Sequence, residues 1–255
     1  FFQSVVSNKF VYFGEYWYDN GGLPSILVNY LKTHELNIFE YLDKDKFLKV
    51  SSDDFKNPTA LTTINQNVLM CQTGYLTLRS DLNKTSTVAL GIPNGEIYKA
   101  LNRLLANNIF KGNTDITDDY GRSLLEVGTV DDIINLFNSA LNSVSYDNYP
   151  IVSESSVQNM LKLYLLGAHQ KVLSELHEAK GRADLVVNTD NRRIVFEFKY
   201  AKNETEAKSK LHDAVEQIKT RDYGNIVPNK TELLRIAAVF NADPKVRAFT
   251  EYQEV

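Results

Sequence analysis

Residues 181–199 read Gly-Arg-Ala-Asp-Leu-Val-Val-Asn-Thr-Asp-Asn-Arg-Arg-Ile-Val-Phe-Glu-Phe-Lys. Two apolar-rich runs, 183–187 and 193–199, flank the polar tetrapeptide 188–191. β-Branched and aromatic residues on either side of an Asn/Asp-rich turn are typical of two strands joined as a hairpin. We therefore expect an antiparallel β-hairpin here, and the rest of the fold follows from it.

The predicted hairpin gathers charged side chains at one point. Successive side chains of a strand point to opposite faces, so Glu197 and Lys199 share one face while Phe196 and Phe198 share the other. Asp184 lies on the preceding strand, and a hairpin of this length can bring it beside residues 197–199. The sequence thus predicts two carboxylates and one ammonium group in one place.

This combination of groups suits phosphodiester chemistry. Carboxylates together with water and phosphate oxygens are the ligands that Mg²⁺ prefers, and a nearby lysine can stabilise charge that develops on a phosphate. The alternative is a surface strand on which Lys199 merely pairs with Asp184 or Glu197, as ion pairs commonly do. That alternative weakens for a central strand, where a buried charge needs a partner or a metal.

The Glu-x-Lys triplet by itself is weak, because the chain contains it at 178–180, 197–199 and 206–208. The first triplet lies in a predicted turn and the third on a polar, solvated part of a predicted helix. Only the triplet at 197–199 lies inside an apolar strand.

The elements around the hairpin predict a sheet covered by helices. We expect a helix over 154–169, a strand over 171–176, a long helix from 203 to about 223, and a strand over 233–240. The resulting order is αβββαβ, in which a helix that links two strands of one sheet indicates a parallel or mixed sheet.

The first 150 residues are predicted to be mostly helical with one β-hairpin. Expected elements are helices at 24–31, 62–72, 94–105 and 130–144, strands at 75–78 and 87–90 with a turn at 81–85, and a loop or short helix at 43–54. Helix, hairpin and helix in this order resemble a winged-helix-like unit, an architecture that does not fix a function. The turn-rich segment 145–150 places the domain boundary at 150. The fold class is α/β (α+β), with domains 1–150 and 151–255.

Composition narrows the setting. The net charge of −4 argues against non-specific coating of nucleic acid, and the acidic excess lies wholly in residues 1–150. Cys71 is the single cysteine and lies in an apolar stretch, so we expect a buried thiol in a reducing, cytoplasmic protein. The chain contains no apolar run of transmembrane length. It does not begin with Met, so we expect a processed chain or a fragment of a longer one.

These residues carry a resemblance to the PD-(D/E)XK nuclease superfamily. The segments concerned are Val172-Leu-Ser-Glu175, Gly181-Arg-Ala-Asp-Leu-Val186, Val195-Phe-Glu-Phe-Lys199 and Ala214-Val-Glu-Gln-Ile218. They are similar to one branch of it, the bacterial AAA-ATPase-like proteins with a C-terminal PD-(D/E)XK domain. The resemblance implies a restriction-endonuclease-like domain at 151–255 that cleaves DNA, or else RNA, with Mg²⁺ or Mn²⁺.

The resemblance also implies roles for particular residues. Asp184 and Glu197 would be metal ligands, and Lys199 would be the catalytic lysine. Gln217, on the following helix, would be an auxiliary active-site residue, and Glu154 would be the acid carried by the first helix. For Arg182 two interpretations stay open: it binds substrate phosphate, or it is an ion-pair partner within the hairpin.

Upstream segments extend the resemblance to the tail of the ATPase-like portion. They are Tyr16-Trp-Tyr-Asp-Asn-Gly21, Gln72-Thr-Gly-Tyr-Leu-Thr77 and Leu90-Gly-Ile-Pro-Asn94. The chain lacks a Gly-x4-Gly-Lys-Ser/Thr phosphate loop, so we expect no ATP site in it and consider an ATPase half or a protein as a possible partner. The alternative function is a catalytically silent nuclease-fold module that binds protein or nucleic acid.

Overall fold

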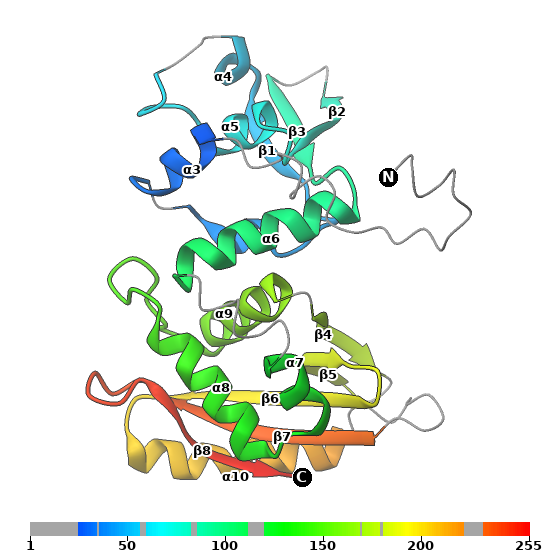
Figure 1. The fold of residues 1–255 in the computed structure, drawn as a ribbon, viewed down its shortest axis with the longest axis vertical. Coiled ribbons are helices and arrows are strands. Elements are labelled where there is room, and N and C mark those ends of the chain that lie inside the picture. Colours follow the sequence, from blue (N-terminus) through cyan, green and yellow to red (C-terminus); the bar gives the residue numbers. More distant parts are fainter. Residues whose placement is uncertain are drawn as a thin grey trace. The chain divides into compact units, whose positions relative to one another are not determined.

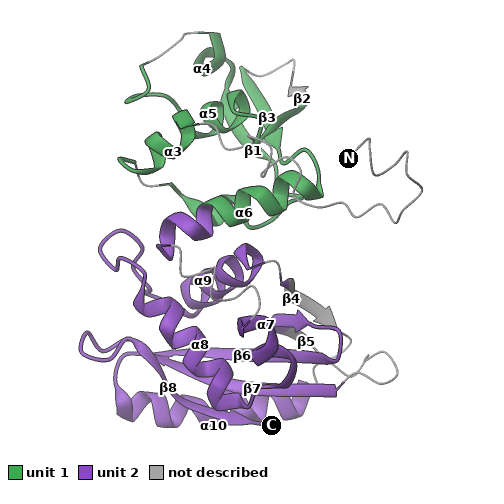
Figure 2. Ribbon diagram, viewed as in Figure 1, with its two compact units in different colours: residues 1–104 green, residues 105–255 purple. Residues whose placement is uncertain are grey.

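The structure is a computed structural model that describes residues 25–34, 36–56, 60–82, 86–111, 120–168, 170–178, 181–221 and 232–255 (Figure 1). It divides into two compact units, Phe1–Leu104 and Leu105–Val255 (Figure 2). The second unit includes two helices that precede residue 150. The predicted boundary at 150 remains a prediction about where the nuclease-like domain begins.

Unit 1 combines short helices with a small antiparallel sheet. Its elements are α3 (Ser25–Leu31), a 3-10 helix (Ile38–Tyr41), β1 (Leu48–Ser51), α4 (Ser52–Lys56), α5 (Gln66–Gln72), β2 (Thr77–Leu82), β3 (Thr87–Gly91) and α6 (Gly95–Ile109), the last of which continues past the unit boundary. The strand order is β1-β3-β2, with both pairings antiparallel. The predicted hairpin is present as β2 and β3, while residues 83–85 of its turn lie outside the described residues.

The ends of α5 follow from its sequence. The predicted helix 62–72 begins only at Gln66, because Asn65 is extended and its side-chain oxygen accepts a hydrogen bond from the Asn67 N–H at 2.9 Å. After the helix, Gly74 has a φ of 86°, a left-handed conformation that glycine adopts without strain. The stretch 43–54, predicted as a loop or short helix, instead contains β1 and the start of α4.

Unit 2 is built around a mixed five-stranded sheet. Its elements are α7 (Tyr120–Val127), α8 (Val130–Asn142), α9 (Glu154–Gly167), β4 (Lys171–Glu178), β5 (Gly181–Asn188), β6 (Arg192–Ala201), α10 (Glu204–Arg221), β7 (Glu232–Asn241) and β8 (Ala248–Glu254). The strand order is β4-β5-β6-β7-β8, and only β6 and β7 run parallel. The predicted αβββαβ order and mixed sheet are confirmed, with β8 added at the edge.

Helices cover both faces of this sheet. In Figure 1, α10 lies on one face while α7, α8 and α9 lie on the other. On the α10 face, Val195 of β6 packs with Ala214 and Ile218 of the helix. On the opposite face, Phe196 contacts Phe137 of α8, with ring centroids 5.3 Å apart. The strand is therefore buried on both sides, which is why its polar residues need a specific explanation.

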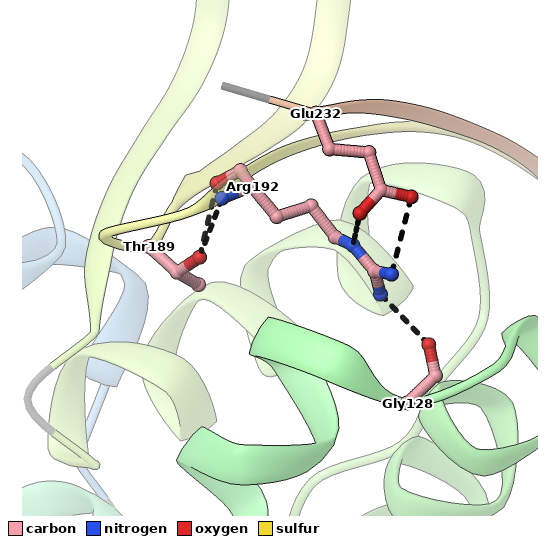
Figure 3. A network of polar contacts seen from close by, with 4 residues as sticks. All are labelled: Gly128, Thr189, Arg192 and Glu232. Carbon is pink, nitrogen blue, oxygen red and sulfur yellow. Dashed lines mark hydrogen bonds and ion pairs between the residues drawn. The ribbon is translucent and has the colours of Figure 1, made fainter. Parts of the chain in front are cut away.

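Arg192 fixes the start of β6 to its surroundings (Figure 3). Its guanidinium donates to both carboxylate oxygens of Glu232, at 3.0 and 3.2 Å, and to the carbonyl oxygen of Gly128 at 2.7 Å. Its backbone exchanges hydrogen bonds with the Thr189 hydroxyl. One buried arginine thus ties together the β5–β6 turn, the start of β7 and the end of α7.

Replacing Arg192 with methionine is expected to lower the free energy of unfolding by about 2 kcal/mol, because the half-buried Gly128 carbonyl loses its charged donor. Glu232→Gln is the matched control. The Glu232 side chain is 58% exposed, so its loss should cost less than about 1 kcal/mol. Urea unfolding of both variants measures the difference. Equal losses would contradict the view that the bond to the Gly128 carbonyl, and not the ion pair with Glu232, accounts for the stabilisation by Arg192.

Candidate active site

The site forms where β5 and β6 stop pairing through their backbones. Their antiparallel register runs from the pair Asn188 and Arg193 to the pair Leu185 and Phe196. Beyond that point the Asp184 side chain takes over, and its Oδ2 accepts a hydrogen bond from the Phe198 N–H at 2.9 Å. The carboxylate that the sequence placed beside residues 197–199 is therefore held against that strand by a backbone donor.

Glu197 is fully buried in the middle of β6. Its Oε1 accepts a hydrogen bond from Lys199 Nζ at 2.7 Å, while Oε2 is buried and has no hydrogen-bond partner among the described residues. Burial, and next the negative charge of Asp184, raise the pKa of Glu197 from 4.5 to about 7, although the bond from Lys199 opposes the shift. The effect of Asp184 on this pKa indicates that the two carboxylates interact, as expected.

Lys199 lies between two carboxylates. Its Nζ is 2.7 Å from Glu197 Oε1 and 3.6 Å from Glu154 Oε1, and its side chain is 16% exposed. Burial alone lowers the pKa of Lys199. The hydrogen bond to Glu197 and the charges of Glu197, Glu154 and Asp184 raise it by more, so the pKa stands above its ordinary value. The lysine therefore carries its positive charge at neutral pH.

Glu154 reaches this cluster from the first residue of α9. The helix starts there because Ser153 is extended and accepts a hydrogen bond from the Ser156 N–H, which forms a capping box. A carboxylate is favoured in the first turn by the helix dipole. The structure thus brings together Glu154, Glu197 and Lys199, three of the residues singled out from the sequence.

Gln158 is a neighbour of the site that the sequence did not reveal. It lies one helical turn after Glu154 on α9, and its side-chain amide donates a hydrogen bond to the backbone carbonyl of Asp184. The contact holds the backbone of β5 at the point where its pairing with β6 ends. The i, i+4 spacing from Glu154 was the only signal available in the sequence.

Two other predicted residues are placed less fully. Gln217 lies on α10, between Val215 and Ile218, which pack against the sheet, and it is itself partly buried. Its auxiliary role stays a prediction. The side chain of Arg182 lies outside the described part of the structure, so neither of its two interpretations is decided.

The first and third Glu-x-Lys triplets differ from the second, which lies in β6. Lys208 pairs with Glu204 at 2.7 Å, with both side chains mostly exposed, and Glu206 pairs with Lys210 at 2.7 Å. These are i, i+4 pairs on the solvated face of a helix. The side chains of the triplet at 178–180 lie outside the described residues. Among the described side chains, only Glu197 and Lys199 combine the pattern with burial.

The donor set at this site is small. Within the described ranges, no group of three His, Cys, Asp or Glu side chains could hold a metal ion between them. Mg²⁺, however, usually keeps several waters and is held through one or two carboxylates. Asp184 and Glu197 supply that pair, and Oε2 of Glu197 is a buried acceptor to which no group in the described part of the chain donates. These residues therefore fit a divalent cation.

The domain combines a mixed α/β sheet with a buried glutamate, its lysine partner and an adjacent aspartate. This combination is the one expected of a metal-dependent nuclease domain. Residues 152–250 match the sequence model of the PD-(D/E)XK nuclease superfamily, so the chain carries a domain of this superfamily there. No curated protein matches the chain. No helix in the described residues is long and apolar enough to cross a membrane.

Proposed function

We propose that residues 151–255 form a Mg²⁺- or Mn²⁺-dependent nuclease that cleaves phosphodiester bonds in DNA. The observation that carries this proposal is Glu197, whose fully buried carboxylate has one oxygen on Lys199 and the other without a partner among the described residues. A buried carboxylate is costly unless its charge is balanced. Keeping one in the core of a central strand, with Asp184 beside it, favours a functional explanation.

The geometry supports roles for Asp184, Glu197, Lys199 and Glu154. Asp184 and Glu197 would hold the cation, which supplies polarisation of the phosphodiester and acidification of a water molecule. Lys199 is charged and lies 2.7 Å from Glu197 Oε1, so it would hydrogen-bond the phosphate and stabilise the negative charge that develops there. Glu154 would orient Lys199 through its 3.6 Å ion pair. The family resemblance, and not the geometry, assigns Gln217 an auxiliary role on α10, and it leaves Arg182 either as a phosphate-binding residue or as an ion-pair partner within the hairpin.

Cleavage of DNA in the presence of Mg²⁺ or Mn²⁺ tests the proposal. We expect wild-type protein to degrade plasmid and linear DNA, EDTA to stop it, and Asp184→Ala to remove the activity. Asp190→Ala is the matched control, because Asp190 is an exposed aspartate in the turn between the same two strands. Cleavage that survives Asp184→Ala would refute the assignment. Parallel reactions with circular DNA, linear DNA and RNA identify the mode of attack and the nucleic acid.

The second candidate is a catalytically silent module that binds protein or nucleic acid. The observation that favours it is that the described residues contain no three-ligand metal cluster. Titration calorimetry with Mn²⁺ separates the nuclease from the silent module. A silent module would give no heat of metal binding but would still bind its protein or nucleic-acid partner.

For unit 1 we infer a winged-helix-like tail of an AAA-ATPase-like module. Support comes from its order of α3, β1, α4, α5 and a β2–β3 hairpin, with β1 paired to the second hairpin strand. Such a unit would join the nuclease to an ATPase half or to another protein. Co-purification of the full chain with an ATPase from its source cell tests this inference.

A further inference from the structure

A small pocket lies in unit 2, apart from the carboxylate cluster. It has a volume of about 160 Å³ and is lined by residues from the end of α8, the connection 143–150, β7 and the turn after it. In Figure 1 the connection and the turn lie toward the end of the sheet where β6 and β7 finish, and Arg247 of the turn contacts Tyr146 of the connection. The pocket is smaller than the roughly 300–1,000 Å³ of sites for drug-sized ligands, so it suits a single small group.

Arg247 is the charged group of this pocket. One face of its guanidinium rests on the ring of Tyr146, with Cζ 3.5 Å from the ring centroid. Its Nε is buried and has no hydrogen-bond partner among the described residues. Buried donors are almost always paired, with protein, water or an ion, so an unpaired one that borders a pocket points to an absent acceptor.

The backbone of Arg247 indicates that its position is imposed by the turn. Its φ is 44°, in the left-handed region that a non-glycine residue rarely adopts. The conformation is held by the hydrogen bonds from the Val246 and Arg247 N–H groups to the Asp243 carbonyl. Such strain clusters at ligand sites, where the surrounding structure fixes a side chain in place. The guanidinium is thus held in place, with one face covered by the Tyr146 ring.

We propose that this pocket binds a backbone phosphate of the nucleic-acid strand, with Arg247 as its donor. Arginine matches phosphate because its planar fork can make two parallel hydrogen bonds. Stacking on Tyr146 leaves that fork free, because it uses the face of the guanidinium and not its N–H edge. The inference rests on the proposed function, which supplies the nucleic acid.

The pocket is linked to the end of β6 that carries Lys199. Phe240, which lines it, is paired in register with Tyr200, the residue after Lys199, and the two rings stack. Tyr146 is close enough to Tyr200 to raise its pKa, although burial is the larger cause. Tyr200 and Lys199 lie on opposite faces of β6, so a nucleic-acid strand with one phosphate at Lys199 would pass around this end of the sheet to place another phosphate at Arg247.

Binding of a fluorescently labelled single-stranded oligonucleotide to the full chain, followed by anisotropy in EDTA, tests the proposal without cleavage. Arg247→Gln is expected to weaken binding about tenfold. It should also reduce the slope of the logarithm of the binding constant against the logarithm of the salt concentration by the amount that corresponds to about one phosphate contact. The control is Lys245→Gln, which removes one positive charge from an exposed residue of the same turn and should change binding less than twofold. If Arg247→Gln does not fold, Tyr146→Leu removes the stacking surface at unchanged charge and should weaken binding as well.

Each outcome decides the proposal. Equal effects of the Arg247 and Lys245 variants, or no oligonucleotide binding by the wild-type chain, would overturn it. Inorganic phosphate could raise the melting temperature of the wild-type chain but not of Arg247→Gln, while both bind the oligonucleotide equally. That result would show a site for a free anion and contradict the proposed contact with a nucleic-acid strand. If Arg247→Gln loses oligonucleotide binding but the wild-type chain never cleaves DNA, phosphate binding by the pocket would be supported and the proposed nuclease activity refuted.

Discussion

Replacing Lys199 with methionine is expected to lower the rate of DNA cleavage by a factor of about 10²–10³, the usual loss when one preorganised donor to developing charge is removed. The lysine is close to both Glu197 and Glu154, and its charge is the only positive one among the described side chains of this cluster. Methionine keeps the length of the side chain and removes only the ammonium group. Initial rates with Mg²⁺ and linear DNA measure the loss.

Lys208→Met is the matched control for this substitution. Lys208 belongs to another Glu-x-Lys triplet, but its side chain is exposed and pairs with Glu204 on the surface of α10. Its loss should change the cleavage rate less than twofold and the stability by only a few tenths of a kcal/mol. Rates that fall equally in both variants would mean that Lys199 acts through general charge and not through its place in the site.

The stability of the metal-free protein is expected to fall as the pH rises from about 5 to 8. Glu197 has a pKa raised from 4.5 to about 7, so the folded state prefers its protonated form. The stability that the protonated Glu197 side chain adds to the folded state is fully present below pH 4.5 and is lost as the pH rises through 7. Because the side chain is only 1% exposed, the difference corresponds to roughly 3 kcal/mol. Urea unfolding across this range, in EDTA, measures it.

Glu197→Gln should flatten this part of the pH profile, because an amide does not titrate, and it should also remove cleavage. Glu254→Gln, at an exposed carboxylate of β8, should leave the profile unchanged. A slope in Glu197→Gln as steep as in the wild type would show that another group titrates. Adding Mn²⁺ should restore most of the lost stability at pH 8, because a bound cation favours the ionised carboxylate.

The sequence predicted the relative positions of Asp184, Glu197 and Lys199 because those positions depend only on residues close together along the chain or across one hairpin. Strand alternation placed Glu197 and Lys199 on one face, and a short turn placed Asp184 beside them. Both rules involve neighbours in sequence or across one hairpin. The burial that distinguishes this triplet from the one around Lys208 could also be predicted, because the flanking residues are apolar.

The parts that sequence reasoning missed depend on contacts between distant segments. β1 exists because it pairs with β3, some 40 residues later; its own four residues alternate apolar and polar but form too short a run to indicate a strand. β8 closes the edge of the sheet beside β7 and was not predicted at all. Gln158 contacts a backbone carbonyl on another element, and no pattern of side chains announces such a bond.

Diffraction from crystals soaked in Mn²⁺, recorded at a wavelength where manganese scatters anomalously, tests the central claim most directly. The account predicts an anomalous peak in contact with Asp184 and with the Glu197 oxygen Oε2, and its loss in crystals of Asp184→Asn. A Mn²⁺-saturated crystal with no peak between these two carboxylates would contradict a metal-dependent nuclease site at this position.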